Sequence, residues 1–118
     1  MTSTPHLTAQ PENAYPKLIR DNIPELVKSQ GKTAATRVLT DDTEYTTFLL
    51  AKLIEEATEL AQAKTSQAQK EELADVYEVL DAVLELLQLT PADIATVQKE
   101  KSQQRGGFKK RLLMLVKP

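Results

Sequence analysis

The chain has 118 residues, a formal net charge of −2 and no cysteine. This length fits one domain with one modest core, and the absence of cysteine excludes disulfides, a thiolate nucleophile and cysteine-ligated metal centres. No overall positive charge would attract nucleic acid or an anionic membrane, and no apolar run approaches the ~20 residues that span a bilayer. We therefore expect a cytoplasmic protein with neither of these partners.

Residues 1–14 are expected to form a flexible tail in front of a single domain at residues 15–118. The tail has no periodic apolar pattern, and it lacks the charged start and apolar stretch of a signal peptide. It holds the chain's single histidine, His6. The Glu-x-x-His pairs that bind iron in ferritin-like bundles are therefore absent.

A short helix is predicted over residues 23–29. Asp21 and Asn22 are candidates for its N-terminal cap, and Gly31 is expected to end it. The sequence Ala-Ala-Thr-Arg-Val-Leu at residues 34–39 predicts a short strand.

Two long helices follow, and they give the clearest pattern in the sequence. The first opens with a capping box at Asp41 and Glu44 and runs to about residue 63, with apolar residues at helical spacing. The second opens with a similar box at Ser66 and runs to Leu87. The loop between them is very short, which makes the two helices antiparallel neighbours.

A third helix of this kind is predicted, with Thr90 as its N-terminal cap and Pro91 at its first position. It runs to about Arg105, where two glycines stop it. The apolar residues 112–116 are expected to form a short strand or a packing tail. The fold class is therefore all-α: an antiparallel helical hairpin forming a four-helix-type bundle, with minor strands near the termini. The apolar surface of the second long helix exceeds what one further helix would cover. We therefore expect a homodimer or higher homo-oligomer to complete the bundle, with the active site near the interface.

Four acidic residues lie at or beside positions where apolar residues would be expected. With Glu56 at zero on a helical wheel of about 100° per residue, Leu49 lies at about 20°, so Glu56 is inside the apolar arc. By the same construction Glu72 lies inside the apolar arc of the next helix, and Glu59 and Asp75 lie on the shoulders of the two arcs.

Burying an unpaired carboxylate is costly, so such groups are usually paired or bound to a metal. Antiparallel pairing across the short loop brings Glu59 level with Glu72 and Glu56 level with Asp75. The result is a box of four carboxylates, and Lys52 is the nearest cation that could neutralise it. Ligands that are all oxygen favour a hard cation, Mg²⁺ or alternatively Mn²⁺.

Three other acidic residues of the two long helices are not expected to belong to the box. Glu55, Glu71 and Glu78 fall on more polar arcs and are expected to be solvated. Glu55 also stays open as a group that supports the metal ligands or as a catalytic base. A single acidic pair on a helix is usually a solvated face, but two pairs in register across a hairpin favour a site.

Three motifs, in order along the chain, carry a resemblance to a known family. Residues 55–59 and 72–75 match an EExxE…ExxD signature, residues 17–24 are similar to a KLVRDxIP opening, and residues 101–108 are similar to a closing KxxxRGGF. The chain thereby resembles the all-α nucleotide pyrophosphohydrolases, which include MazG, the dimeric dUTPases and phosphoribosyl-ATP pyrophosphohydrolase. The resemblance covers about residues 15–112 and points to a small phosphoribosyl-ATP pyrophosphohydrolase-like branch.

The resemblance implies a Mg²⁺-dependent hydrolase in which water attacks the α-phosphorus of a nucleoside triphosphate or related nucleotide. The products would be the monophosphate and pyrophosphate, and removal of non-standard nucleotides is one role this activity serves. The implied metal ligands are Glu56, Glu59, Glu72 and Asp75, and the candidate catalytic residues are Glu55 and Glu56.

Cationic side chains are expected to meet the phosphates, because negative charge develops there in the transition state. Each candidate could instead serve only a helix dipole or solubility. The candidates are Lys17, Arg20, Lys101, Arg105 and Lys109.

Two rival functions stay open at this point. One is a non-catalytic helical module with a regulatory role, which binds nucleotide and metal without turnover. The other is a purely structural oligomerisation domain. No motif in the sequence indicates which base or sugar a substrate would carry.

Overall fold

The structure is a computed structural model that describes residues 15–118. Across these residues it contains four helices and no strand: α1 (Ile23–Ser29), α2 (Asp42–Gln62), α3 (Ser66–Leu87) and α4 (Pro91–Arg105). The all-α prediction is confirmed, and each helix lies where the sequence pattern placed it. The tail expected at residues 1–14, with His6, lies outside the described residues.

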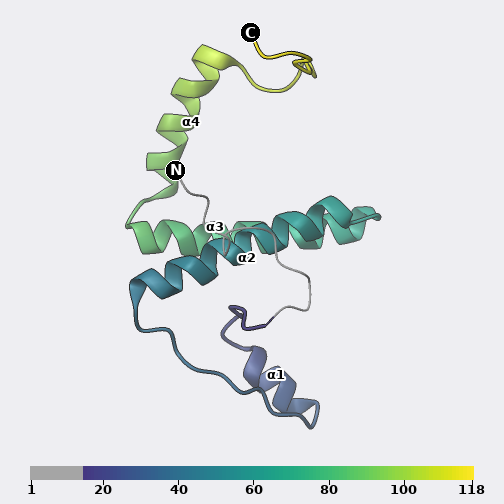
Figure 1. The fold of residues 1–118 in the computed structure, drawn as a ribbon, viewed down its shortest axis with the longest axis vertical. Helices are drawn as coiled ribbons and strands as arrows, with labels where there is room; N and C mark the ends of the chain where they lie inside the picture. The colour runs from purple at the N-terminus through teal and green to yellow at the C-terminus, as the bar shows by residue number, and fades with distance from the viewer. Residues whose placement is uncertain (1–14) are drawn as a thin grey trace.

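The helical hairpin formed by α2 and α3 is the centre of the molecule (Figure 1). Its two helices run antiparallel and pack along one another, as the short connection between them requires. At the start of α2, the Asp41 side chain accepts a hydrogen bond from the Glu44 amide at 3.0 Å. At the start of α3, the Thr65 hydroxyl accepts one from the Ala68 amide at 3.1 Å. These caps satisfy amides that have no partner within the helix.

Two details of the predicted caps are wrong. Thr65, and not Ser66, is the N-cap of α3, because the chain is still extended at Thr65 and Ser66 is already helical. Glu44 does not complete a capping box, because its carboxylate accepts two hydrogen bonds from the Arg37 guanidinium instead.

The ends of α1 follow the prediction only in part. Asn22 occupies the N-cap position, but its side chain makes no capping hydrogen bond. Gly31 follows the end of the helix with a φ of 80°, and its amide donates to the Lys28 carbonyl at 3.0 Å. Glycine adopts this left-handed conformation without steric cost, so Gly31 ends the helix as expected.

The two short strands predicted at residues 34–39 and 112–116 are absent. A strand needs a neighbouring strand to pair its backbone groups, and neither segment has one. Val38 is 83% exposed in the first segment. The second segment is exposed along its whole length, so it is not a tail packed on this copy of the chain either.

The apolar core is small. Among the described residues, only Leu49 on α2 and Val79 on α3 are apolar and buried. Other apolar residues of the hairpin, such as Phe48 and Val83, are half-buried. A single hairpin can shield only one face of each helix, so the hairpin leaves much of its apolar surface uncovered.

The fourth helix, α4, projects away from the hairpin (Figure 1), and all its residues are exposed. Its start is held by a complete capping box, in which the Thr90 hydroxyl accepts from the Asp93 amide and the Asp93 carboxylate accepts from the Thr90 amide. Because every residue of α4 is exposed and no extensive contact joins it to another described helix, its stability depends on such local interactions.

We expect Thr90→Ala to loosen α4 alone. Loss of an N-cap side chain costs about 1 kcal/mol, which is roughly a fivefold change in an opening equilibrium. Amide hydrogen exchange in α4 should therefore accelerate about fivefold, while exchange in α2 and α3 stays unchanged. Thr96→Ala is the matched control, because the Thr96 hydroxyl only donates within the helix, to the Ala92 carbonyl. Equal acceleration in all helices would contradict the independence of α4.

None of the helices in the described part of the chain is long and apolar enough to cross a membrane. The cytoplasmic location expected from the sequence stays a prediction.

Candidate metal centre

Acidic side chains from both long helices meet on one side of the hairpin. Ligand oxygens of Glu56 on α2 and of Glu72 and Asp75 on α3 all lie within 4.8 Å of one another. Oxygens of Glu55, Glu56 and Glu59 form a second group with the same spacing. The structure thus brings together all four residues predicted as metal ligands, and Glu56 belongs to both groups.

Helix geometry explains why these residues meet. Glu56 and Glu59 are three residues apart on α2, and Glu72 and Asp75 are three residues apart on α3, so each pair projects from one side of its helix. The antiparallel hairpin then places the two pairs opposite each other across the seam where α2 and α3 pack. The short loop determines the register of this pairing.

Glu56 is among the most deeply buried side chains of the described residues, with only 5% of its surface exposed. Burial raises the pKa of its carboxyl to about 8, and hydrogen bonding to Glu59 together with the negative charges of Glu59 and Asp75 adds to this effect. The nearby Lys52 ammonium acts in the opposite direction and is too weak to cancel it.

The pKa of Glu72 is also raised by burial and by the neighbouring carboxylates. Burial raises the pKa of its carboxyl to about 6, and the charge of Glu59 adds to the shift. Its Oε2 atom is buried and has no hydrogen-bond partner among the described residues. A buried acceptor without a partner is unfavourable, so this oxygen is available to a ligand that enters the cluster.

The expectation that Glu55 is solvated is wrong, since only 6% of its surface is exposed. Its Oε2 lies 3.2 Å from the Lys52 ammonium and 3.8 Å from that of Lys17. The helical wheel considered only the contact between α2 and α3, whereas Glu55 is covered by the segment that precedes α1. Glu71 and Glu78 are exposed as expected.

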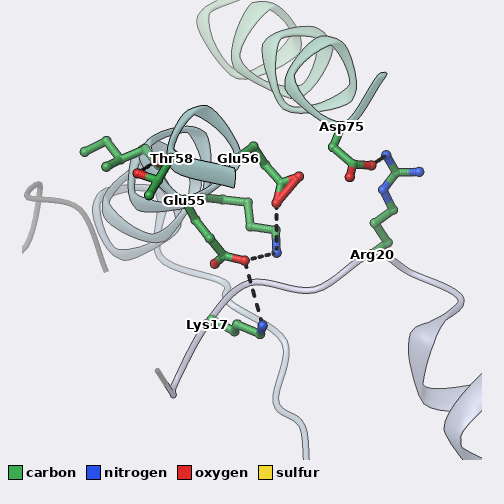
Figure 2. A network of polar contacts seen from close by, with 8 residues as sticks. Lys17, Arg20, Glu55, Glu56, Thr58 and Asp75 are labelled. Atoms are coloured by element: carbon green, nitrogen blue, oxygen red, sulfur yellow. Dashed lines mark hydrogen bonds and ion pairs between the residues drawn. The ribbon is translucent and has the colours of Figure 1, made fainter. Parts of the chain in front are cut away.

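The segment before α1 crosses the cluster, as Figure 2 shows. From this segment Lys17 approaches Glu55, and the Arg20 guanidinium donates a hydrogen bond to Asp75 Oδ1 at 2.8 Å. Lys17 also lies over the ring of Tyr15, 5.1 Å from its centroid. Two of the five predicted phosphate-binding cations are therefore at the cluster.

The other three cations are elsewhere. Lys101 and Arg105 are on α4, Lys109 follows it, and all three are exposed on the part of the chain that projects from the hairpin (Figure 1). Within one copy of the chain, the structure does not bring them to the carboxylates.

One further feature was not found from the sequence. An open hollow of about 260 Å³ lies beside the cluster, at the end of the hairpin where the two helices are joined. It is lined by Glu59 and Glu72 and by three uncharged residues, Gln62, Ala63 and Ala68. The small side chains of the two alanines leave this space open, and only the pairing of the helices reveals that they are neighbours.

The cluster suits a hard divalent cation. Its donors are all carboxylate oxygens, as such ions prefer, and an unpartnered buried oxygen of Glu72 belongs to it. Among the four carboxylates, Glu56 lies 4.0 Å from the Lys52 ammonium and Asp75 pairs with Arg20, whereas Lys17 lies against the neighbouring Glu55. The residues present therefore fit a metal ion held by Glu56, Glu59, Glu72 and Asp75.

Comparisons with known proteins find similarity to an uncharacterized protein over part of the chain. No family model matches the chain, and no solved structure matches it. A curated protein of Mycolicibacterium smegmatis (strain ATCC 700084 / mc(2)155), described as uncharacterized, is 50% identical over 52 residues. The match covers 44% of this chain and 52% of the relative, so the chain spans about half the length of that protein.

Proposed function

We propose that this protein is a magnesium-dependent nucleoside triphosphate pyrophosphohydrolase that releases a nucleoside monophosphate and pyrophosphate. The observation that carries the proposal is the meeting of Glu56, Glu72 and Asp75 from two helices, with ligand oxygens within 4.8 Å of one another. Like charges gathered in a buried place destabilise a fold. A bound cation offsets this repulsion, and the resemblance in three motifs supplies the reaction class.

A Mg²⁺ ion held by Glu56, Glu59, Glu72 and Asp75 would supply positive charge toward the phosphates and a bound water of lowered pKa. The residues around it position the reacting groups. The Lys52 ammonium lies 3.2 Å from Glu55 and 4.0 Å from Glu56, so it orients both carboxylates. Glu55 is the nearest carboxylate outside the four ligands and is our candidate to accept the proton that the attacking water must lose.

Lys17 and Arg20 are our candidates for binding the phosphates. Both come from the segment that crosses the cluster. Arg20 pairs with Asp75 in the protein described here. Asp75 would hold the metal ion together with the other three ligands, and the Arg20 guanidinium offers donors in a fork geometry that matches phosphate oxygens.

The decisive experiment measures pyrophosphate release from a panel of standard and modified nucleoside triphosphates, with Mg²⁺ or Mn²⁺ and after chelation. We expect metal-dependent release from at least one member of the panel. Nucleotide binding without any product would instead favour the non-catalytic regulatory module. The panel also tests whether non-standard nucleotides are preferred, as a house-cleaning enzyme requires.

We further propose that the functional form is a homodimer. Thirteen large apolar residues from Leu73 onward are exposed, whereas the whole described chain buries only Leu49 and Val79 as apolar core. Extensive exposed apolar surface on a small protein marks an interface. Light scattering at micromolar concentration should therefore give twice the mass of one chain, and a monomer would contradict this.

Arg20→Ala provides a separate test of the phosphate-binding role. We expect kcat/KM to fall about 10- to 100-fold, as loss of one charge-assisted hydrogen bond to the transition state would cause. Stability should change little, because exposed ion pairs contribute little.

Arg37→Ala is the matched control for Arg20→Ala. It removes the exposed ion pair with Glu44, which lies at the start of α2 and outside the cluster. It should leave kcat/KM unchanged. An equal loss of activity in both variants would show that Arg20 acts only through the fold.

A further inference from the structure

The exposed side of α3 carries a row of uncovered apolar side chains. Leu73, Tyr77, Leu80 and Leu87 are all exposed, and Tyr77 is exposed by 69%. Their spacings of four, three and seven residues place them along one side of the helix. We call this row the α3 stripe. Within one copy of the chain, 41–69% of the surface of each of these side chains is exposed.

A second uncovered apolar surface lies at the C-terminal end. Residues 106–118, which we call the C-terminal arm, contain no helix. Five consecutive apolar residues of the arm, Leu112–Val116, are 73–85% exposed. Because α4 carries the arm away from the hairpin (Figure 1), the arm does not reach the α3 stripe of its own chain.

The two surfaces have opposite charge. The α3 segment, residues 66–87, contains six carboxylates and one lysine. Two of the carboxylates, Glu72 and Asp75, belong to the cluster against α2, so the exposed residues of α3 are four carboxylates and one lysine, a formal net charge of −3. Three of its exposed acids, Glu78, Asp81 and Glu85, lie in the helix turns that carry the stripe. The C-terminal arm contains four cations and no acidic side chain, a formal net charge of +4. Complementary charge of this kind orients two surfaces and speeds their association.

We propose that the C-terminal arm of one copy docks on the α3 stripe of a second copy, and that the second copy returns the contact. The apolar residues Leu112–Val116 cover the stripe, and the basic residues on either side of them face the acidic residues of α3. Each protomer gives one arm and receives one, which is the reciprocal pattern of a two-fold symmetric dimer. This inference rests on the proposed homodimer and is independent of the proposed catalysis.

Direct packing of α3 on the α3 of a second copy is the less favourable arrangement. It would bring together two helices whose exposed residues each carry a net charge of −3, and like charges across an interface repel. It would also leave the apolar residues of the arm in water. Exchange of the arms covers both surfaces at once.

The first test measures the dimer dissociation constant of the full chain. We expect Leu113→Asp with Leu115→Asp in the arm, and separately Tyr77→Asp in the stripe, to weaken the dimer roughly 30-fold or more, the loss typical of a hot-spot residue. The arm variant lies outside every helix, so it does not threaten folding of the hairpin. Val38→Asp is the control, since Val38 is an exposed apolar residue outside both surfaces and should have no effect.

The second test identifies which surfaces meet. The chain has no cysteine, so a thiol can be introduced at a single place. One protein carries Tyr77→Cys, another carries Leu115→Cys, and the two are mixed with a short bismaleimide cross-linker, which does not require disulfide geometry. We expect covalent dimers in the mixture and far fewer with either protein alone.

The outcomes separate this inference from the proposed function. A wild-type dimer that the arm variant does not weaken, or one that cross-links only between two Tyr77→Cys chains, would overturn arm exchange and leave the homodimer standing. A monomeric wild type would overturn both. Neither readout depends on nucleotide turnover, so an inactive protein would leave the arm exchange in place.

Discussion

Glu56→Gln is expected to reduce metal-dependent pyrophosphate release at least about 100-fold, because loss of a metal ligand should exceed the 10- to 100-fold effects of residues that only support ligands. The same substitution should stabilise the metal-free protein. It removes a carboxyl that is 95% buried beside Glu59 and Asp75 and whose pKa is raised from 4.5 to about 8. Since one unit of pKa shift corresponds to about 1.4 kcal/mol, the gain at pH 8 should be on the order of a few kcal/mol.

A metal ligand is distinguished from a structural residue by opposite effects of its substitution: activity falls, whereas the stability of the metal-free protein rises. Urea denaturation without metal measures the stability, and pyrophosphate release with Mg²⁺ measures the activity. Glu25→Gln is the matched control, because Glu25 is an exposed carboxylate on α1 and its loss should leave both quantities nearly unchanged. If Glu56→Gln lost activity and stability together, Glu56 would be a structural residue and the metal-site proposal would fail.

The second large expected effect is a fall in the stability of the metal-free protein between about pH 5 and pH 8. The pKa of Glu56 is raised from 4.5 to about 8, and that of Glu72 is raised from 4.5 to about 6. In this range the folded protein therefore binds more protons than the unfolded chain does. Linkage then requires the free energy of unfolding to decrease as the pH rises.

Two groups with lowered pKa values do not affect how stability changes between pH 5 and pH 8. The pKa of Glu44 lies below 4.5 because of its hydrogen bonds to Arg37, and that of Asp93 lies below 3.8 because of its hydrogen bonds to Thr90. The stability they contribute is lost only at more acidic pH. Glu56→Gln should flatten the part of the profile between about pH 6 and pH 8 and leave the part below pH 6 to Glu72.

Added Mg²⁺ should reverse this pH dependence. Metal binding requires ionised carboxylates, so protons compete with the ion, and a ligand that binds only the folded state stabilises it. The increase in melting temperature caused by Mg²⁺ should therefore be larger at pH 8 than at pH 6. A stability profile that is flat from pH 5 to pH 8 without metal would contradict the burial of Glu56 and Glu72.

The helices and the pairing of the carboxylates follow from the sequence itself. Helical periodicity and N-cap residues act over a few positions, so they placed α2, α3 and α4 correctly, and Thr90 forms the predicted cap. The short loop after α2 allows only antiparallel packing. That constraint, combined with the rise of a helix per residue, is enough to place Glu56 opposite Asp75.

What the tertiary structure alone decided depends on contacts between distant parts of the chain. The Arg20–Asp75 hydrogen bond joins residues that are 55 positions apart in the sequence. No local sequence pattern predicts it. Glu55 is buried because the segment before α1 covers it, and a helical wheel contains no information about that segment. Residues 34–39 have the composition of a strand and form none, because a strand requires a partner and the fold supplies no partner there. Helices and their caps depend on residues that are close in sequence, so the sequence predicts them. Burial and ion pairing depend on which distant segment of the chain packs against a residue, so only the tertiary structure shows them.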